Sequence, residues 1–402
     1  MSADGALSSP FVVGWVAPPQ RNDEWSRAVT PPTQLPGLLP EPRSRPEPKY
    51  YSAPPPPGAP RTEPPLLPPE PEPERKPKPK PLVVIVGPTA SGKSTLAMAI
   101  AALAGGEILS CDSVQIYRGF DIGSGKVMPE AQRGIRHHLL DIADPACTFT
   151  AGDYRREALR VLRSLRSSAE GPAKLPIVVG GTGLYLRALL LGLFEGPPRD
   201  EALRDRVRQL AARRGRAFLH RLLARLDPAT AARIHPRDTQ KIGRALEVCL
   251  VARQPLSALL AQGRAGLTGF QPLKIGLNPD RASLYRRINQ RIERMYANGL
   301  VEETRAILAR PDASKIKGLG ALGYRQAGVA ARGEISLTEA MVETQSATRH
   351  YAKRQLTWFR REPDITWLAG FGDEPQIQRL ALDWLTEQRA RLEAPGRGTI
   401  SL

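Results

Sequence analysis

One stretch decides the fold of this chain: Leu82-Val83-Val84-Ile85-Val86-Gly87-Pro88-Thr89-Ala90-Ser91-Gly92-Lys93-Ser94. Its first five residues are apolar and mostly β-branched, which predicts a buried strand. Gly87 and Gly92 bracket four residues, and Lys93 and Ser94 follow, which is the spacing of a phosphate-binding loop. Residues 96–104 are helix formers, so a strand precedes the loop and a helix follows it. We therefore predict an α/β fold with a P-loop NTPase-like parallel sheet core.

The residue types in this loop suit anion binding. A loop that wraps a phosphate aims consecutive backbone N–H groups inward, and a Cβ at its glycine positions would obstruct it. Lys93 supplies a positive charge, the Ser94 hydroxyl can hold Mg²⁺, and the helix N-terminus also faces the anion. Ser94 is the predicted Mg²⁺ ligand. The predicted diphosphate- or nucleotide-binding residues of the loop are Gly87, Pro88, Thr89, Ala90, Ser91, Gly92, Lys93 and Ser94.

Composition divides the chain into four segments. Residues 1–80 hold more than half of the 40 prolines and show no apolar periodicity, so we predict a disordered Pro-rich N-terminal tail. Residues 81–196 are the first part of the predicted core, and residues 269–402 are its second part with C-terminal helices. Between them, residues 197–268 are helical in pattern, rich in arginine and without a strand signal, which predicts an inserted all-helical domain.

The charge of the chain is strongly positive. The formal net charge is +18, and lysine and arginine nearly balance aspartate and glutamate in the first 80 residues, so the excess belongs to the predicted folded part. Such an excess suggests an anionic partner larger than one nucleotide, with nucleic acid as the first candidate. A solvated, arginine-rich surface would give the same composition, and composition alone leaves both interpretations open.

Several classes of protein are disfavoured. Three cysteines, Cys111, Cys147 and Cys249, lie far apart without metal-ligand spacing, which argues against a disulfide framework or a zinc site. No apolar run reaches membrane-spanning length, and the N-terminus lacks the apolar segment of a signal peptide. We therefore expect a cytoplasmic protein without a membrane partner. Nothing suggests a coiled coil or a large interface, so we expect a monomer.

A carboxylate follows the second predicted strand. Residues 107–110 predict a short strand that runs into Asp112-Ser113-Val114-Gln115-Ile116-Tyr117. A polar residue just past a strand end lies where parallel α/β sheets bind their ligands. Asp112 is either such a ligand-facing carboxylate or a helix cap, and its place one strand after the phosphate loop favours the first.

Another apolar strand, over residues 175–179, ends in Gly180-Gly181-Thr182-Gly183-Leu184-Tyr185. Backbone and the Thr182 hydroxyl can approach a ligand closely there. An ATPase usually carries an acidic residue at the end of such a strand, and none is present. The loop is therefore predicted to hold a phosphorylated substrate for some other transfer. Residues 137–142 predict one more strand, on which His137 and His138 point to opposite faces and cannot share a metal ion.

Polar residues also recur on later predicted helices. Arg287, Arg291 and Met295 lie at i, i+4 and i+8, which suits a diphosphate clamp and a solvated basic face equally. The helix predicted over residues 343–361 interleaves basic and aromatic side chains, which suits an RNA surface or an anionic pocket, while Trp358 and Phe359 fit a protein core equally well. The sheet is predicted to resume over residues 273–277, and residues 375–392 predict one surface helix.

Together these motifs resemble the tRNA dimethylallyltransferase (tRNA isopentenyltransferase) family of bacterial type, over residues 82 to about 368. The blocks that carry the resemblance are residues 87–94, 112–117, 179–185 and 240–247, the helix with Arg287, Arg291 and Met295 followed by Gly299-Leu300, and residues 351–360. The resemblance implies a P-loop core with a helical insertion that grips the anticodon stem-loop of tRNA. It also implies transfer of a dimethylallyl group from dimethylallyl diphosphate to the exocyclic amine (N6) of the adenosine 3′ to the anticodon, with release of diphosphate.

The resemblance also implies residue roles. Asp112 would be the base that takes the proton of the amine, and Thr182 would lie beside it on the RNA side of a channel. Lys93 and Mg²⁺, completed by Arg287 and Arg291, would neutralise the leaving diphosphate. The residues that would contact tRNA are Asp112, Ser113, Val114, Gln115, Thr182, Arg204, Gln240, Lys241, Ile242, Gly243 and Arg244.

Some features depart from the family pattern, and rival functions remain. Residues 1–80 have no counterpart in the family core. The family's stretch after the second block is Gly123-Ser124-Gly125-Lys126-Val127 here, and of that stretch only Lys126 is retained. The rivals are an adenylate isopentenyltransferase that acts on free AMP, ADP or ATP, a small-molecule kinase that uses ATP, and a non-catalytic RNA-binding protein. The basic helical insertion favours RNA as the acceptor.

Overall fold

The computed structural model describes residues 78–166 and 173–393. The disordered tail predicted for residues 1–80 lies almost wholly outside the described residues. Nothing in the described ranges is both long and apolar enough, as a single helix, to cross a lipid bilayer.

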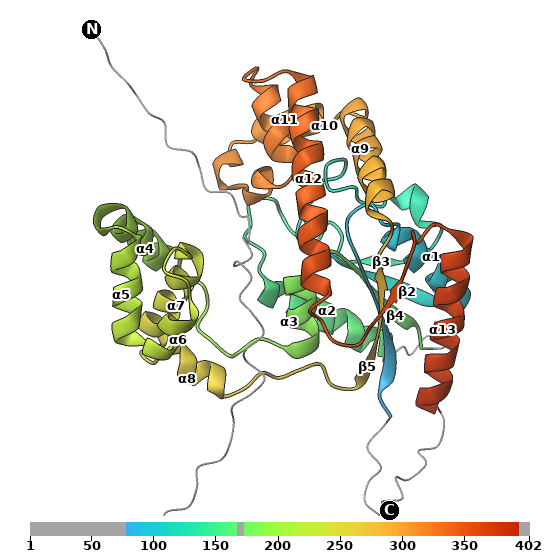
Figure 1. The fold of residues 1–402 in the computed structure, drawn as a ribbon, viewed down its shortest axis with the longest axis horizontal. Coiled ribbons are helices and arrows are strands. Elements are labelled where there is room, and N and C mark those ends of the chain that lie inside the picture. The colour runs from blue at the N-terminus through green and yellow to red at the C-terminus, as the bar shows by residue number, and fades with distance from the viewer. Residues whose placement is uncertain (1–77, 167–172, 394–402) are drawn as a thin grey trace, which may run out of the picture. The chain divides into compact units, whose positions relative to one another are not determined.

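Six parallel strands form one sheet in the order β3-β2-β4-β1-β5-β6 (Figure 1). Every pair of neighbours in this sheet runs parallel, which agrees with the predicted α/β class. Because parallel strands present their carboxyl ends at one edge, the loops after β1, β2 and β4 meet there. The strands are β1 (Lys80–Val86), β2 (Gly106–Cys111), β3 (His137–His138), β4 (Leu175–Gly180), β5 (Phe270–Leu277) and β6 (Ile365–Leu368).

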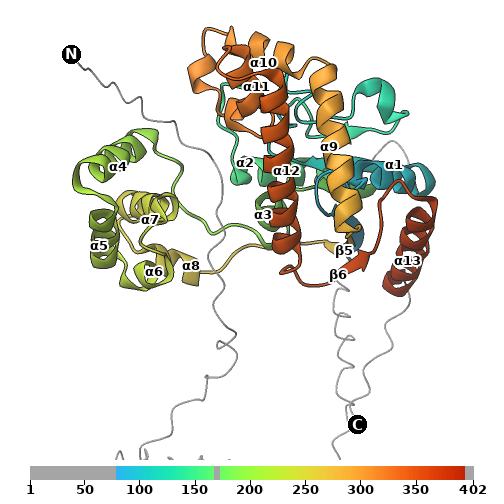
Figure 2. The same cartoon turned by 45° about the horizontal axis from the view of Figure 1, so that its top comes forward.

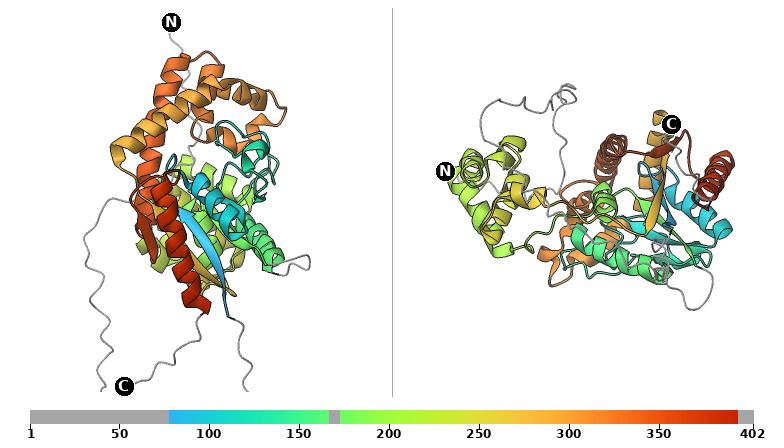
Figure 3. Two further views of the ribbon diagram at one scale, coloured as in Figure 1. Left: turned by 90° about the vertical axis from the view of Figure 1, so that its right-hand side faces the viewer. Right: turned by 90° about the horizontal axis from the view of Figure 1, so that it is seen from below.

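Alternate residues of the central strand β1 enter two different cores, as expected for a sheet covered on both faces. Val83 and Ile85 pack against α1 and α13, which lie on one face of the sheet (Figure 3). Leu82, Val84 and Val86 pack against α2 and α3 on the other face. The helices are α1 (Lys93–Ala104), α2 (Ala151–Arg166), α3 (Gly183–Leu191), α4 (Glu201–Arg214), α5 (Arg216–Leu226), α6 (Pro228–Arg233), α7 (Thr239–Ala252), α8 (Leu256–Ala261), α9 (Arg281–Ala297), α10 (Leu300–Leu308), α11 (Tyr324–Ala331), α12 (Leu337–Phe359) and α13 (Pro375–Glu393).

Helices α4 to α8 interrupt the chain between β4 and β5, as the sequence predicted for an all-helical insertion. They share a core of their own, in which Leu219, Leu223, Ile242 and Leu246 are fully or almost fully buried. Helices α9 to α12 follow β5 and precede β6 in the sequence, and they pack together as a second helical group (Figure 2). This group shares a core around Leu300 and Tyr324 with Ile116, Tyr117 and Phe120 of the segment after β2.

Three sequence-based predictions need correction. The strand predicted over residues 137–142 ends at His138, because Leu139 and Asp141 adopt left-handed φ angles of 65° and 55°. The helix predicted over residues 343–361 begins at Leu337, where Ser336 and Glu339 form a capping box. The predicted strand at residues 273–277 already begins at Phe270.

The last helix has a mixed character. The sequence predicts a surface helix over residues 375–392, and α13 indeed covers Pro375–Glu393. Its buried residues Ile377, Ala381 and Leu385 belong to the core on one face of the sheet. Their spacing of four residues places them in one stripe, so α13 is amphipathic and covers the sheet.

Candidate active site

The phosphate-binding loop connects β1 to α1 at the carboxyl edge of the sheet. Gly87 and Gly92 have φ angles of 148° and 83°, which favour glycine. A Cβ on Gly87 would lie 2.9 Å from the Leu277 carbonyl oxygen, so β5 leaves no room for a side chain there. Helix α1 begins at Lys93, so its unpaired N–H groups face the loop. The local sequence thus produces the expected anion cradle.

A cavity of about 100 Å³ lies against this loop, and we call it the inner pocket. It adjoins a more open hollow of about 760 Å³, the outer pocket, because both are lined by Lys93, Ser94, Gly125 and Arg291. The inner pocket brings together the ends of β1, β2 and β4 with helices α9 and α12. Its polar side chains belong to Thr89, Lys93, Ser94, Ser110, Asp112, Gln115, Ser124, His137, Arg291, Tyr351 and Gln355.

Lys93 lies at the junction of the two pockets. Its Nζ donates a hydrogen bond of 2.6 Å to the carbonyl oxygen of Pro88. The pKa of Lys93 is lowered to about 7, first by burial and then by the nearby Arg291 guanidinium, while the charge of Asp112 opposes both effects. Two cations held together in a buried place destabilise each other, and an anion between them would relieve this. The pair therefore suits a polyanionic ligand.

Arg291 on α9 points into the same site. Burial lowers the pKa of its guanidinium, while the carboxylate of Asp112 raises it. Gly125, with φ of 61°, makes room for it, because a Cβ on Gly125 would overlap a guanidinium nitrogen of Arg291. The glycine is fixed by its neighbour Lys126, whose Nζ is 2.5 Å from both Asp121 and Asp141. The sequence singled out Arg291 and Lys126 but gave Gly125 no role.

Gly125→Ala is expected to push Arg291 out of the pocket. We expect KM for the diphosphate substrate that the resemblance implies to rise about tenfold or more, since a charge-assisted hydrogen bond contributes roughly 1.5–3 kcal/mol. Gly119→Ala is the matched control, because Gly119 also has a positive φ but an added Cβ meets nothing within 4 Å. Equal KM values for the two variants would contradict this role.

Asp112 follows β2 directly and faces the inner pocket. Its Oδ1 accepts hydrogen bonds from the backbone N–H groups of Val114 at 2.8 Å and Gln115 at 3.3 Å. Among residues 78–166 and 173–393, no group donates a hydrogen bond to its Oδ2. Asp112 can therefore fill both roles that the sequence left open, because Oδ1 caps the turn while Oδ2 remains available to a ligand.

The other residues expected beside Asp112 surround it on the acceptor side. The Thr182 hydroxyl accepts a hydrogen bond of 3.2 Å from the Ser113 backbone. Gln115 accepts from the Ser110 hydroxyl at 2.9 Å and donates to the Ser124 carbonyl at 3.2 Å, so its side chain lies inside the pocket. Val114 is partly buried in the core of the second helical group. Asp112 and Gln115 line the pocket, and Thr182 lies next to it.

Arg287 takes a different place from the one the resemblance implies. Its guanidinium stacks 3.7 Å from the ring centroid of Phe371 and makes two bonds to Asp373, of 2.6 and 2.8 Å. It lines neither pocket. Asp373 neighbours the phosphate-binding loop, since the backbone N–H of the preceding residue, Gly372, donates a hydrogen bond of 2.9 Å to the Ser91 carbonyl. The structure thus brings Arg291 to the pocket and leaves Arg287 behind the loop.

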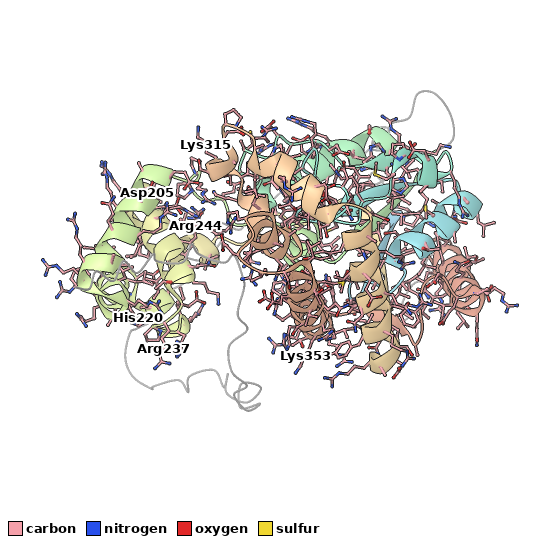
Figure 4. The ribbon with its side chains drawn as sticks, turned by 90° about the horizontal axis from the view of Figure 1, so that it is seen from above. Asp205, His220, Arg237, Arg244, Lys315 and Lys353 are labelled. Carbon is pink, nitrogen blue, oxygen red and sulfur yellow. The ribbon has the colours of Figure 1, made fainter. Side chains whose placement is uncertain are left out.

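In the insertion, two expected tRNA-binding arginines converge on a buried carboxylate. Glu247 is fully buried, and its Oε2 accepts from Arg204 at 2.9 Å and from Arg244 at 2.8 Å. Gln240 and Lys241 are exposed on α7, while Ile242 is fully buried. Figure 4 labels Arg244 on this insertion with Asp205, His220 and Arg237. Arg204 and Arg244 therefore also support the fold of the insertion.

Glu247→Gln is expected to destabilise the insertion by roughly 1–3 kcal/mol, because it removes the charge that two arginines share. Burial raises the pKa of Glu247, but the hydrogen bonds from Arg204 and Arg244 lower it more, so the net pKa lies below its ordinary value of 4.5. The stabilisation that the Glu247 carboxylate contributes is therefore complete above pH 4.5, and it is lost as the pH falls through the lowered pKa. Thermal unfolding at pH 7 and at pH 3 would measure it. The control is Asp205→Asn, which removes an exposed ion pair with Arg208. Equal melting temperatures of the Glu247→Gln and Asp205→Asn variants at pH 7 would contradict the stabilising role of Glu247.

Two residues of α12 complete the pocket. The sequence placed Tyr351 on a helix that suits an RNA surface or an anionic pocket, and it gave Gln355 no role. Tyr351 and Gln355 are one helical turn apart and both line it. Burial raises the pKa of Tyr351 above its usual range, and the charge of Asp112 adds to the rise, so the phenol stays protonated and can donate a hydrogen bond. Their i, i+4 spacing within the 351–360 block was the only available signal.

The residues present fit a magnesium ion bound with a diphosphate. Ser94 is exposed to both pockets and stands beside Lys93. Mg²⁺ usually keeps several waters and takes only one or two protein oxygens together with substrate phosphates. One hydroxyl beside an anion cradle meets that requirement. In the described ranges, no group of three or more histidine, cysteine, aspartate or glutamate side chains could hold a metal without such a substrate.

Comparison with known proteins supplies independent findings. The IPP transferase family profile matches residues 115–362. A tRNA dimethylallyltransferase of Solibacter usitatus (strain Ellin6076) is 53% identical over 301 residues, which cover 75% of this chain and 96% of that relative. The full-length tRNA isopentenylpyrophosphate transferase of Bacillus halodurans aligns with a TM-score of 0.56 at 33% identity, over 78% of this chain and 99% of that one. A eukaryotic dimethylallyltransferase acting on tRNA aligns with a TM-score of 0.65 over 77% and 80% of the two chains, and at 22% identity shows a shared fold.

Proposed function

This chain belongs to the IPP transferase family, and from that premise we propose that it transfers a dimethylallyl group from dimethylallyl diphosphate to N6 of the adenosine 3′ to the anticodon in tRNA. The observation that carries the proposal is one pocket lined by two chemically different kinds of group. Lys93 and Arg291 supply cationic groups to it, and the Asp112 carboxylate lines the same pocket, near enough to raise the pKa of both cations. A leaving diphosphate needs the first, and an amine that loses a proton needs the second.

At the donor end, the protein stabilises the leaving group. The allylic C–O bond breaks and its electron pair moves to the diphosphate, so negative charge grows on the phosphate oxygens. Lys93, Arg291 and the unpaired backbone N–H groups at the start of α1 are proposed to face that charge before the reaction begins. Mg²⁺, which Ser94 would hold, adds Lewis-acid stabilisation of the same oxygens. The loop needs no acidic partner for this task, because no γ-phosphate is cleaved.

At the acceptor end, Asp112 acts as the base. The N6 lone pair attacks the allylic carbon, and the N6 proton passes to the available Oδ2 of Asp112. Because Oδ1 is held by the amides of Val114 and Gln115, the carboxylate cannot rotate away. Thr182 and Gln115 flank this position and are proposed to orient the adenosine, which must leave its base stack to enter the pocket.

The tRNA itself is proposed to contact the insertion. Gln240 and Lys241 are exposed there, and Arg204 and Arg244 keep a partly exposed guanidinium. Cations on this surface would bind phosphates of the anticodon stem-loop in a salt-dependent manner. We further propose that the protein acts as a monomer, and the tRNA substrate points to the cytoplasm.

An acceptor competition tests this function against its rivals. The protein would be incubated with radiolabelled dimethylallyl diphosphate, Mg²⁺ and either unmodified tRNA or AMP. We expect label in tRNA only. Label in AMP alone would establish an adenylate isopentenyltransferase, and ATP turnover without label transfer would establish a kinase. The Solibacter usitatus and Bacillus halodurans proteins named above are tRNA enzymes, which favours the first result.

A further inference from the structure

Gln355 joins the phosphate-binding loop to the loop after β4, two loops that contribute different residues to the active site. Its Oε1 accepts a hydrogen bond of 2.8 Å from the backbone N–H of Thr89 in the phosphate-binding loop. Its Nε2 donates one of 3.1 Å to the carbonyl of Gly181, which follows β4. The side chain is 5% exposed. One side-chain amide therefore bonds two loops. We call the phosphate-binding loop the donor loop, because it would hold the prenyl donor, and the loop after β4 the acceptor loop, because it would lie beside the prenyl acceptor.

The position of this amide is fixed by the fold. Gln355 shares the buried stripe of α12 with Ala352 and Phe359, at i, i+3 and i+7. Phe359 packs into the core under the sheet, and Ala352 packs against α9, so the helix cannot turn about its axis. On the other side, a Cβ on Gly181 would overlap the Gln355 amide nitrogen. The glycine therefore allows the close approach, and the helix directs the side chain into it.

The contact continues to the catalytic carboxylate. The residue after Gly181 is Thr182, whose backbone N–H donates to the Cys111 carbonyl at 3.2 Å and whose hydroxyl accepts from Ser113. Cys111 and Ser113 flank Asp112 on both sides. Hydrogen bonds and the peptide bond between Gly181 and Thr182 thus connect the donor loop through Gln355 to the turn that holds the base. Contacts of this kind control the separation of two reacting groups, to which rates are very sensitive.

We propose that Gln355 is a positioning residue that holds the donor loop and the acceptor loop in register, so that the allylic carbon and the adenosine amine meet at Asp112. The inference rests on the transferase function proposed above. It requires a side chain that accepts at one end and donates at the other. Glutamate keeps the acceptor for Thr89 but turns a carboxylate toward the Gly181 carbonyl, and methionine keeps the length but removes both bonds.

The test compares Gln355→Glu and Gln355→Met with Gln345→Met, a matched control on the same helix whose amide bonds Asn289 and Glu293 outside the pocket. Single-turnover transfer at saturating substrates, the Kd for tRNA and the melting temperature are measured for each. We expect both Gln355 variants to lose about 10- to 100-fold in rate, with Kd for tRNA unchanged. The control should keep the wild-type rate.

Hydrogen–deuterium exchange of the peptide that contains Thr89 supplies a readout independent of activity. It should become faster in Gln355→Met and remain unchanged in Gln345→Met. Wild-type rates in both Gln355 variants, unchanged exchange at Thr89, or a weaker Kd for tRNA that accounts for the whole loss would each overturn the inference. Failure of the wild-type protein itself to transfer label to tRNA would overturn the proposed function, and the inference with it.

Discussion

Asp112→Asn is expected to lower kcat about a hundredfold or more, which is the usual scale for removal of a general base. Asparagine keeps a carbonyl oxygen for the N–H groups of Val114 and Gln115, so the turn after β2 should survive. It cannot take a proton from the adenosine amine. The loss should therefore appear in kcat alone, with the Kd for tRNA and the KM for the diphosphate substrate close to their wild-type values.

The matched control is Asp383→Asn, an exposed carboxylate on α13 far along the chain from the pocket residues. It should behave as wild type in the same single-turnover assay. If Asp112→Asn instead kept kcat and weakened tRNA binding, Asp112 would be an RNA contact and the base would have to be sought elsewhere in the pocket.

Lys93→Met should separate stability from function. The ammonium of Lys93 is held near the Arg291 guanidinium in a site that lowers its pKa to about 7, so in the free protein its charge is a cost. Its removal is expected to leave the melting temperature unchanged or higher. The same change removes a cation from the diphosphate site, so the Kd for dimethylallyl diphosphate should rise roughly 10- to 100-fold.

Lys315→Met is the control for charge and length, since Lys315 is exposed on a short 3₁₀ segment (Figure 4). Isothermal titration with the diphosphate substrate and a thermal melt on the same preparations give both quantities. A lower melting temperature for Lys93→Met, with unchanged affinity for the substrate, would show that Lys93 serves the fold and not the ligand.

Much of the fold could be predicted from local sequence because its signals are local. The β-branched run before Gly87 and the helix formers after Ser94 specify strand, loop and helix without any distant contact. The insertion was equally visible, since α4 to α8 carry no strand pattern. The strand predicted over residues 137–142 was too long, because nothing in the sequence shows that Leu139 takes a left-handed conformation or that Asp141 binds Lys126.

The site was predictable only in part, because its remaining residues depend on contacts between distant segments. Gln355 contacts Thr89, which lies 266 residues away, and only the packed structure brings them together. Arg287 and Arg291 share one helix face, yet Asp373 binds the first and leaves the second for the pocket. Periodicity places side chains on a face, but it does not say which partner they meet there.

The most direct measurement of the central claim is the identity of the modified nucleoside. An unmodified anticodon stem-loop RNA would be incubated with the protein, dimethylallyl diphosphate and Mg²⁺, then digested to nucleosides and analysed by mass spectrometry. The account predicts N6-dimethylallyladenosine from the position 3′ to the anticodon, and no product from an RNA in which that adenosine is replaced by a purine without the exocyclic amine. A dimethylallyl group elsewhere in the RNA, or no modified nucleoside at all, would contradict it.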